Sequence, residues 1–310
     1  MASTTPLSAG TARRRAPWRD YLELTKPRVV ALMLFTVVVG MLLARPDAPP
    51  WPVLAFGVLG IALVAGSAAA VNHLVDQRID AIMARTRGRP LPRGALGTPQ
   101  VALFAAALCA AGLALLLAFT NPLCALLTVG SLIGYAGVYS LFLKRHTPQN
   151  IVIGGAAGAA PPLLGWVAVT GAIEPGALLL FLIIFVWTPP HFWALAIHRK
   201  DDYAKAGVPM LPVTHGVPFT ATRVLQYAIG LWAITLLPQA IGMVGSVQPW
   251  TGWLYTAGAA GFGARFIRFA WKLRQEPARW AMPTFRWSII DLFALFALLL
   301  AEHYLSVALG

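Results

Sequence analysis

Long apolar stretches, separated by short polar loops, constrain the fold of this chain more than any other feature. We distinguish nine of them, at roughly residues 27–44, 51–75, 98–119, 122–143, 149–170, 175–197, 219–243, 247–270 and 286–307. About 20 apolar residues are enough for a helix to cross the hydrocarbon core of a bilayer. Lipid offers no hydrogen-bond partner for backbone N–H and C=O groups, so these groups must pair within the segment, and such stretches therefore predict helices. We therefore predict an all-α bundle of nine transmembrane helices around a central cavity that opens near the cytoplasmic face.

The basic residues are distributed unevenly between the two sides of the predicted bundle. The chain has 24 Lys and Arg against 11 Asp and Glu, a net charge of +13. If the N-terminus is cytoplasmic, every Lys and Arg except Arg45 falls in or beside a cytoplasmic loop, which is the usual bias of membrane proteins. The charge therefore predicts an orientation in the lipid bilayer, with a cytoplasmic N-terminus and a periplasmic C-terminus, and no nucleic-acid partner.

The N-terminal segment and the two cysteines refine this picture. Residues 1–20 are polar, lack the apolar core of a cleavable signal and predict a disordered cytoplasmic tail, followed by one transmembrane domain over residues 21–310. A mitochondrial transit peptide is the alternative, but the segment is short for that role, so we expect a bacterial inner membrane. Cys109 and Cys124 lie within apolar stretches and are expected to be buried thiols rather than a disulfide.

Asn72, Asp76 and Asp80 recur at every fourth residue directly after an apolar run. On a helix this spacing places the three side chains one above another. Stacked carboxylates repel one another, and a hard divalent cation with oxygen ligands, commonly shared with substrate phosphates, relieves that repulsion. The pattern favours Mg²⁺ that holds a diphosphate. The alternative is a solvated helix end with two acids in phase.

A basic loop follows these acids. Between Met83 and Gly94 it is broken by glycine and prolines, and it carries or adjoins Arg78, Arg85, Arg87, Arg89 and Arg93. Guanidinium groups that face metal-binding acids suit the oxygens of a phosphate. The alternative is ordinary positive-inside bias, which accounts for part of the cluster.

Three further groups of residues are candidates for the same site. Tyr139 lies close to Lys144 and Arg145 at the end of the fourth stretch, so these side chains can point at a diphosphate. Lys26 and Arg28 either reach that site or, as we expect, anchor the first helix to lipid headgroups. The proline pairs Pro161-Pro162 and Pro189-Pro190 predict broken helices that line a roomy pocket.

Taken together, these residues resemble the UbiA-type intramembrane prenyltransferases, and within that family most closely the branch that farnesylates haem. The resemblance runs from residue 20 to about residue 215. It rests on the acid ladder and on five longer motifs, which are Lys26-Pro-Arg28, Met83-Ala-Arg85-Thr86 with Arg89-Pro90-Leu91, residues 150–162, Trp187-Thr-Pro-Pro-His191-Phe-Trp193, and residues 202–212.

The resemblance implies the reaction and the site. A farnesyl group passes from farnesyl diphosphate to a vinyl group of haem b, water adds, and the product serves haem–copper oxidases. It also implies Mg²⁺ as cofactor, with haem A synthase or terminal oxidase assembly factors as possible partners. The residues predicted for catalysis are Asn72, Asp76, Asp80, Arg85, Arg89, Tyr139, Lys144 and Arg145, and the metal ligands are Asn72, Asp76, Asp80 and Asp202.

The haem-binding part of the prediction is more open. We expect His191, His73, Trp193, Asp202 and Tyr203 to contact the bound substrate, with a core hydrogen-bonding role as the alternative for either histidine. The family's second Asp-xxx-Asp motif is not reproduced, because its positions fall on Arg199 and Tyr203. That departure leaves the second metal-binding set, to which Asp202 would belong, less well defined than the first.

Two other functions fit parts of the pattern. A prenyltransferase for an aromatic quinone precursor would need the same acids but a smaller acceptor slot. A transporter would also use intramembrane acids and broken helices. Against a transporter, the acids are expected near the interface rather than at the membrane centre, and no inverted repeat is evident.

Overall fold

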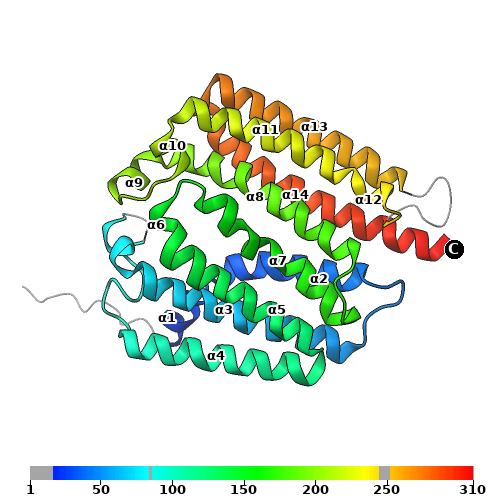
Figure 1. The fold of residues 1–310 in the computed structure, drawn as a ribbon, viewed down its shortest axis with the longest axis horizontal. Helices are drawn as coiled ribbons and strands as arrows, with labels where there is room; N and C mark the ends of the chain where they lie inside the picture. Colours follow the sequence, from blue (N-terminus) through cyan, green and yellow to red (C-terminus); the bar gives the residue numbers. More distant parts are fainter. Residues whose placement is uncertain (1–16, 84–85, 244–251, 310) are drawn as a thin grey trace, which may run out of the picture.

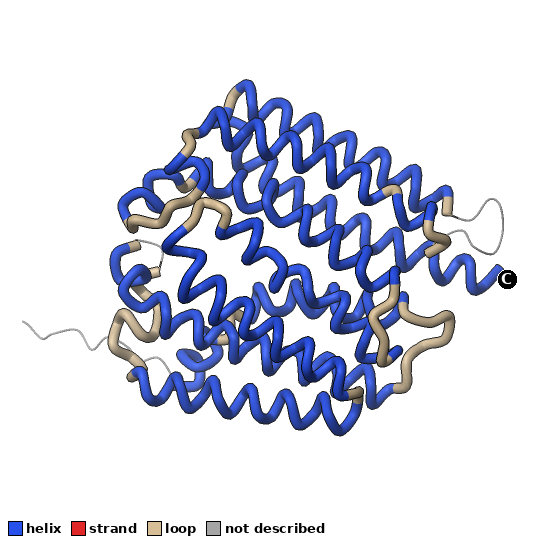
Figure 2. Tube along the Cα trace, viewed as in Figure 1, coloured by secondary structure: helices blue, strands red, loops and turns tan. Residues whose placement is uncertain are grey.

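The computed structural model describes residues 17–83, 86–243 and 252–309, and within them it contains helices and no strand (Figure 1, Figure 2). The all-α prediction is therefore confirmed for the described residues. The long elements are α2 (Pro27–Leu43), α3 (Trp51–Ile82), α4 (Thr98–Phe119), α5 (Pro122–Leu132) with η1 (Ile133–Leu143), α7 (Asn150–Thr170), α8 (Pro175–His198), α11 (Val217–Thr235), α13 (Trp253–Gln275) and α14 (Pro277–Leu309). The short elements are α1 (Pro17–Leu24), α6 (Lys144–His146), α9 (Lys200–Lys205), α10 (Leu211–Thr214) and α12 (Leu237–Ala240).

Fewer helices than predicted meet the length and hydropathy expected of a membrane span. Six described segments do so, namely α3, α4, α5 with η1 and α6, α7, α8 and α14. A seventh results if α1 and α2, which meet at 53°, count as one bent span. The predicted stretches at α11 and α13 fall short because both helices contain arginines and small or polar residues. The count of nine spans is thus not confirmed, whereas a multi-span helical architecture is.

The described helices form two packed groups, which meet where α7 lies against α8 (Figure 1). One group contains α2, α3, α4, α5, η1 and α7, and the other contains α8, α11, α13 and α14. Between α2 and α7 the backbones touch, since a Cβ built on Gly40 or on Gly165 would lie 2.1 Å from a carbonyl oxygen of the other helix. Small residues at these positions permit this approach, as is usual for helices in membranes.

Two expectations need correction. The proline pairs do not break their helices, because α7 and α8 run continuously through them and bury all four prolines. Tight packing explains the difference in α7, where the carbonyl of Pro162 lies against Gly40 of α2. The predicted tail of residues 1–20 also ends early, since Pro17 begins α1 and Asp20 forms an ion pair with Arg93. Both cysteines are free, as expected, although Cys109 is only half-buried.

Candidate active site

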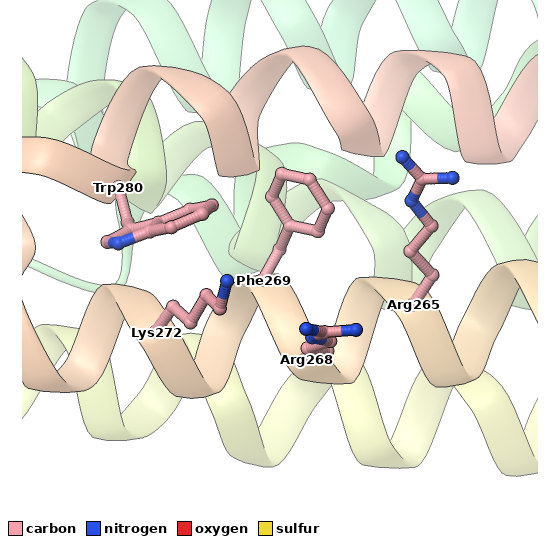
Figure 3. Close-up of a pocket in the computed structure, with 5 residues that line it drawn as sticks. All are labelled: Arg265, Arg268, Phe269, Lys272 and Trp280. Carbon is pink, nitrogen blue, oxygen red and sulfur yellow. The ribbon is translucent and has the colours of Figure 1, made fainter.

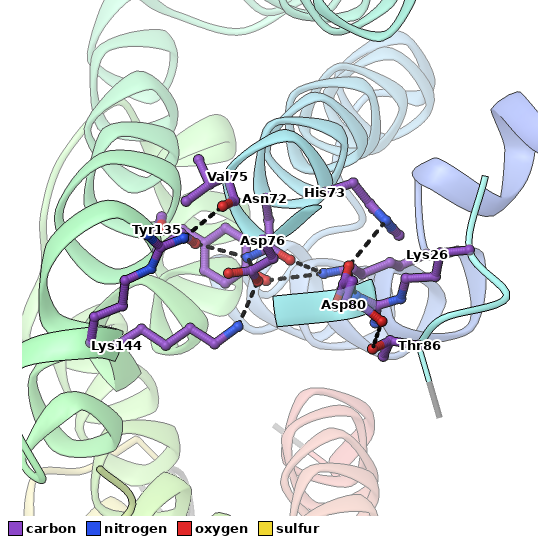
Figure 4. Close-up of polar contacts among 12 residues, drawn as sticks. Lys26, Asn72, His73, Val75, Asp76, Asp80, Thr86, Tyr135 and Lys144 are labelled. Carbon is purple, nitrogen blue, oxygen red and sulfur yellow. Dashed lines mark hydrogen bonds and ion pairs between the residues drawn. The ribbon is translucent and has the colours of Figure 1, made fainter. Parts of the chain in front are cut away.

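The acid ladder lies in the last third of α3 and is buried (Figure 4). Asn72, Asp76 and Asp80 are 3%, 1% and 2% exposed. The amide Nδ2 of Asn72 donates to Asp76 Oδ2 at 2.8 Å, so these two side chains share one face of the helix as the spacing predicts. Burial excludes the alternative of a solvated helix end. Buried carboxylates require compensation by partners, and these come from other elements.

Each acid of the ladder has a basic partner from outside α3. Lys144 Nζ, which follows η1, lies 2.6 Å from Asp76 Oδ2. Arg89 Nη1, in the loop after α3, lies 2.6 Å from Asp80 Oδ2. Both cations are partly exposed while both carboxylates are buried, so the cations form the solvent side of the cluster. In this arrangement two basic groups can turn to an incoming anion while the acids remain in place.

Lys26 joins the same cluster, which corrects our expectation that it anchors α2 to lipid. Its ammonium donates to Asn72 Oδ1 and lies 3.5 Å from the hydroxyl of Tyr135. Lys26 stands at the bend between α1 and α2 in the left-handed region, with φ of 49°. Non-glycine residues adopt that conformation rarely, and it occurs often at functional positions. The bend therefore directs this side chain into the site.

The η1 segment supplies a wall of the cluster. Ser140 Oγ accepts a hydrogen bond from Asn72 Nδ2 at 2.9 Å and donates to the carbonyl of Tyr135 at 2.9 Å. The rings of Tyr135 and Tyr139 stack with centroids 5.7 Å apart. Neither Tyr135 nor Ser140 was predicted from the sequence, although Ser140 stands four residues before Lys144, a spacing that places both on one helical face. The η1 segment is a π-helix of 11 residues, and π-helical turns are frequent at functional sites.

Tyr139 and Arg145 lie beside the cluster rather than in it. The ring of Tyr139 packs on the backbone of Gly154, where an added Cβ would lie 2.2 Å from a ring atom. Arg145 is exposed and donates to the carbonyl of Val75 at 2.8 Å, so it ties the end of η1 to α3. Arg85, the remaining basic candidate, lies outside the described residues.

The second charged loop carries two of the predicted site residues, Asp202 and Tyr203. Asp202, on α9, pairs with Arg199 of the same loop at 3.5 Å. Among the described residues no three His, Cys, Asp or Glu side chains are grouped to hold a metal ion. Tyr203 is partly buried and packs against the main hydrophobic core.

The two favoured histidines occupy different surroundings. His73 is 2% exposed, its Nδ1 lies 4.0 Å from Asp80 Oδ2, and neither ring nitrogen has a hydrogen-bond partner among the described residues. His191 instead bonds Ser288 Oγ through Nδ1 at 2.7 Å and stacks on Trp187 with centroids 4.1 Å apart. The contacts of His191 therefore match the alternative of a core hydrogen-bonding role. Trp193 is 2% exposed and packs edge-on against Tyr227.

The sequence and the fold both match known proteins. The sequence model of the UbiA prenyltransferase family matches residues 33–290. The chain belongs to the UbiA prenyltransferase family. This membership confirms the resemblance drawn from the motifs and leaves the transporter alternative without support.

Related UbiA proteins are similar to this chain over nearly their whole length. Proteins named protoheme IX farnesyltransferase are 57% identical in Marinobacter nauticus, covering 97% of this chain and 98% of the relative, and 59% identical in Azotobacter vinelandii, covering 96% and 98%. A solved digeranylgeranylglyceryl phosphate synthase superposes with a TM-score of 0.77 at 20% identity, covering 93% of this chain and 99% of that one. A UbiA homologue from Archaeoglobus fulgidus bound to DMAPP and Mg²⁺ superposes with a TM-score of 0.63 at 18% identity, covering 94% and 100%. The solved structures thus establish the fold.

Within this UbiA fold the cluster, like the first turn of α7, has buried polar atoms without a hydrogen-bond partner among the described residues. Asp76 Oδ1 is buried and accepts no hydrogen bond from the described residues. Asn150, in the first turn of α7, is fully buried with neither amide atom paired among them. Buried polar atoms without partners are costly and rare in native proteins. The free oxygen of Asp76 fits a hard metal ion, because carboxylate and amide oxygens are the ligands that Mg²⁺ prefers.

Proposed function

We propose that this chain transfers the farnesyl group of farnesyl diphosphate to a vinyl group of haem b, with addition of water, giving haem O and diphosphate. The observation that carries the proposal is the buried cluster in which Asp76 and Asp80 each face a movable cation. The name shared by relatives at 57–60% identity supports haem as the acceptor. The UbiA homologue bound to DMAPP and Mg²⁺ supports a prenyl diphosphate and a metal as the ligands.

The residues divide into those that hold the metal and those that hold the diphosphate. Asn72, Asp76 and Asp80 would hold Mg²⁺, with Asp202 as a candidate for a second metal-binding set. When bound, Mg²⁺ would neutralise negative charge on the departing diphosphate. The basic side chains that contact the ladder, which are Lys26, Arg89 and Lys144, would take the diphosphate oxygens, and Arg85 is a further candidate. Arg145 would act indirectly, through its contact with the carbonyl of Val75 on α3.

The chemistry requires departure of an anion from an allylic carbon. The bond between C1 of the farnesyl group and the diphosphate oxygen breaks, and its electron pair leaves with the diphosphate. Lys144 and Arg89 are already adjacent to the acids, so they stabilise that charge without a large rearrangement. The π electrons of the vinyl group form the new carbon–carbon bond to C1. Water then adds to the resulting cation and loses a proton, which produces the hydroxyethylfarnesyl side chain.

The acceptor side of the site is assigned from the remaining candidates. His73 is buried one residue from Asn72 with both ring nitrogens unpaired, which suits a haem or diphosphate contact. Tyr139 and Tyr203 would flank the farnesyl chain or the porphyrin. His191 and Trp193 stay candidates for a haem contact, although the bond from His191 to Ser288 favours a positioning role. The product would be used by haem–copper oxidases, directly or through a haem A synthase.

We further propose the arrangement of the chain in the membrane. The bent pair α1–α2, together with α11 and α13, would bring the six clear spans to nine, in one domain that begins with α1. This places the ladder, the basic loop and α9 at the cytoplasmic end of a central cavity. The N-terminus would be cytoplasmic and the C-terminus periplasmic in a bacterial inner membrane. Cysteines placed at positions 174 and 205 test this, since an external reagent should label 174 alone.

Haem analysis tests the reaction itself. Purified protein in vesicles is incubated with Mg²⁺, farnesyl diphosphate and haem b. The haems are then extracted and separated, and their masses are determined by mass spectrometry. We expect a haem with one added farnesyl group and one water. A parallel reaction with 4-hydroxybenzoate as acceptor tests the quinone-precursor alternative. Prenylated benzoate without modified haem would overturn the proposal, and loss of haem product on chelation of Mg²⁺ would support the metal assignment.

A further inference from the structure

A second charged site lies on the other helical group, away from the acid ladder. Between α13 and α14 there is a cavity of about 310 Å³, lined by Arg265, Arg268, Phe269, Lys272 and Trp280 (Figure 3). The three basic residues are spaced at i, i+3 and i+7, so they share one face of α13. Three positive charges in one cavity repel one another, which favours an anion between them.

In the part of the chain that the structure describes, these cations contact aromatic rings rather than carboxylates. Among the described residues none of the three forms an ion pair or donates a hydrogen bond to a carboxylate, in contrast to Lys144 and Arg89. Arg265 lies 4.1 Å from the ring centroid of Trp287, and Lys272 lies 4.2 Å from that of Trp280. Cation–π contacts of this kind hold Arg265 and Lys272 against the rings and leave the donors of each group available.

A second, apolar cavity continues from the first. It has a volume of about 250 Å³, shares Arg265, and is otherwise lined by Ala257, Gly258, Gly261, Phe262 and Trp287. Arg265 stands ten residues before the end of α13, which corresponds to about 15 Å of helix. A charge that far from the helix end is costly in hydrocarbon unless it is paired. The two cavities together have the shape of a site with a charged head and an apolar tail.

We infer that these cavities bind an anionic phospholipid, with its phosphate among Arg268, Lys272 and Arg265 and an acyl chain along Gly261 and Phe262. Basic pockets between membrane helices at the cytoplasmic side commonly take anionic headgroups. The C-terminal end of α13 lies at the same end of the molecule as α6 and α9 (Figure 1), which is the end that we assign to the cytoplasm. A free phosphate would leave the apolar cavity empty, so the lipid accounts for both.

Lipid retention by the purified protein tests the inference. Delipidated protein is titrated with phosphatidylglycerol or phosphatidylcholine and analysed by native mass spectrometry. We compare wild type with Arg268→Gln/Lys272→Gln and with a control, Arg274→Gln/Arg279→Gln, which removes two charges from the same helices outside the cavity. Wild type and control should bind phosphatidylglycerol selectively, and the cavity variant should bind it about tenfold or more weakly, since hydrogen bonds to charged groups are lost.

Competition experiments distinguish a phospholipid from other anions that could bind in the first cavity. Excess inorganic phosphate and haem b, whose propionates are also anionic, are added as competitors, and neither should displace the lipid from wild type. If the double variant fails to fold, as judged by circular dichroism and gel filtration, Lys272→Met alone should still lower affinity for phosphatidylglycerol. Equal binding of both lipids, equal binding by variant and control, or displacement by haem b or phosphate would overturn the inference.

Discussion

Helices α3 and α14 are nearly equal in length, at 32 and 33 residues, and each buries two acids. The surroundings of those acids differ. In α3, Asp76 and Asp80 face the side-chain cations of Lys144 and Arg89. In α14, Glu302 accepts hydrogen bonds from the backbone N–H groups of Gly252, at 2.5 Å, and Tyr255, at 3.2 Å, at the start of α13.

The difference teaches how a buried acid in a membrane bundle can be assigned a role. A backbone N–H at a helix start is fixed, so the contact between Glu302 and α13 stabilises the fold and cannot be exchanged during a reaction. A lysine or arginine on a long side chain can leave its carboxylate for a phosphate and return. Acids with movable partners therefore mark the reactive end of this molecule, and acids with fixed partners mark its scaffold.

The largest effect is expected for Asp76→Asn. The substitution removes the charge that we propose binds the metal, and the partner of Lys144, while it preserves side-chain volume. Haem O formation should therefore fall about 100-fold or more. The rate is measured as farnesylated haem per protein in vesicles, with thermal unfolding as a check on folding. Glu302→Gln is the matched control, because it neutralises a buried acid of the scaffold. Comparable rates in the two variants would abolish the distinction between α3 and α14.

A smaller loss of activity is expected for Lys144→Gln. It removes a cation that we propose binds the diphosphate, and it leaves Asp76 without its ion pair. Turnover should fall about tenfold or more. Weaker binding of farnesyl diphosphate should appear as a higher KM for that substrate. Arg145→Gln is the neighbouring control, since that side chain contacts a backbone carbonyl instead of an acid. A larger loss in Arg145→Gln than in Lys144→Gln would reverse the roles that we assign.

Glu302→Ala should affect stability rather than chemistry. The loss of an acceptor for two buried N–H groups should cost about 1–3 kcal/mol in the free energy of unfolding. A lower Tm in detergent, with near-normal haem O formation at low temperature, is the expected result. An unchanged Tm would mean that the contact at the start of α13 contributes nothing measurable.

The smallest effect is expected for Asp291→Asn. Asp291 is 1% exposed and its Oδ1 has no hydrogen-bond partner among the described residues. Removal of an uncompensated buried charge by an amide of the same shape should leave the free energy of unfolding within about 1 kcal/mol of wild type or raise it. Thermal unfolding and the rate of haem O formation both test this. A large loss of activity would instead place α14 in the site.

Local regularity determined which parts of the site could be predicted from sequence. The four-residue period of Asn72, Asp76 and Asp80 predicts a shared helical face, and the hydropathy pattern predicts the helices. Lys26 was misassigned because its contact with Asn72 joins residues 46 positions apart through a bend at one residue. Neither periodicity nor hydropathy reports such a contact.

Other features escaped prediction for different physical reasons. The proline pairs predicted helix breaks, but α7 is one continuous helix because it packs against the backbone of α2. Helices α11 and α13 were predicted as spans from their apolar stretches, although neither meets the hydropathy expected of a membrane span. The capping role of Glu302 depends on where α13 begins in space, which no local pattern specifies.

The π-helical turn geometry of η1 makes the number of residues in this span as informative as their identity. A π-helix completes each turn with extra residues, so deletion of one residue between Ile133 and Leu143 would let the segment relax to an ordinary α-helix. Hydropathy would hardly change and the span would still insert. Lys144 would nevertheless be rotated by about 100° relative to the start of the helix and carried away from Asp76. Homologous chains that keep the same motifs but differ in this length would then differ in catalysis, and alignment gaps here would report on chemistry rather than on loop variation.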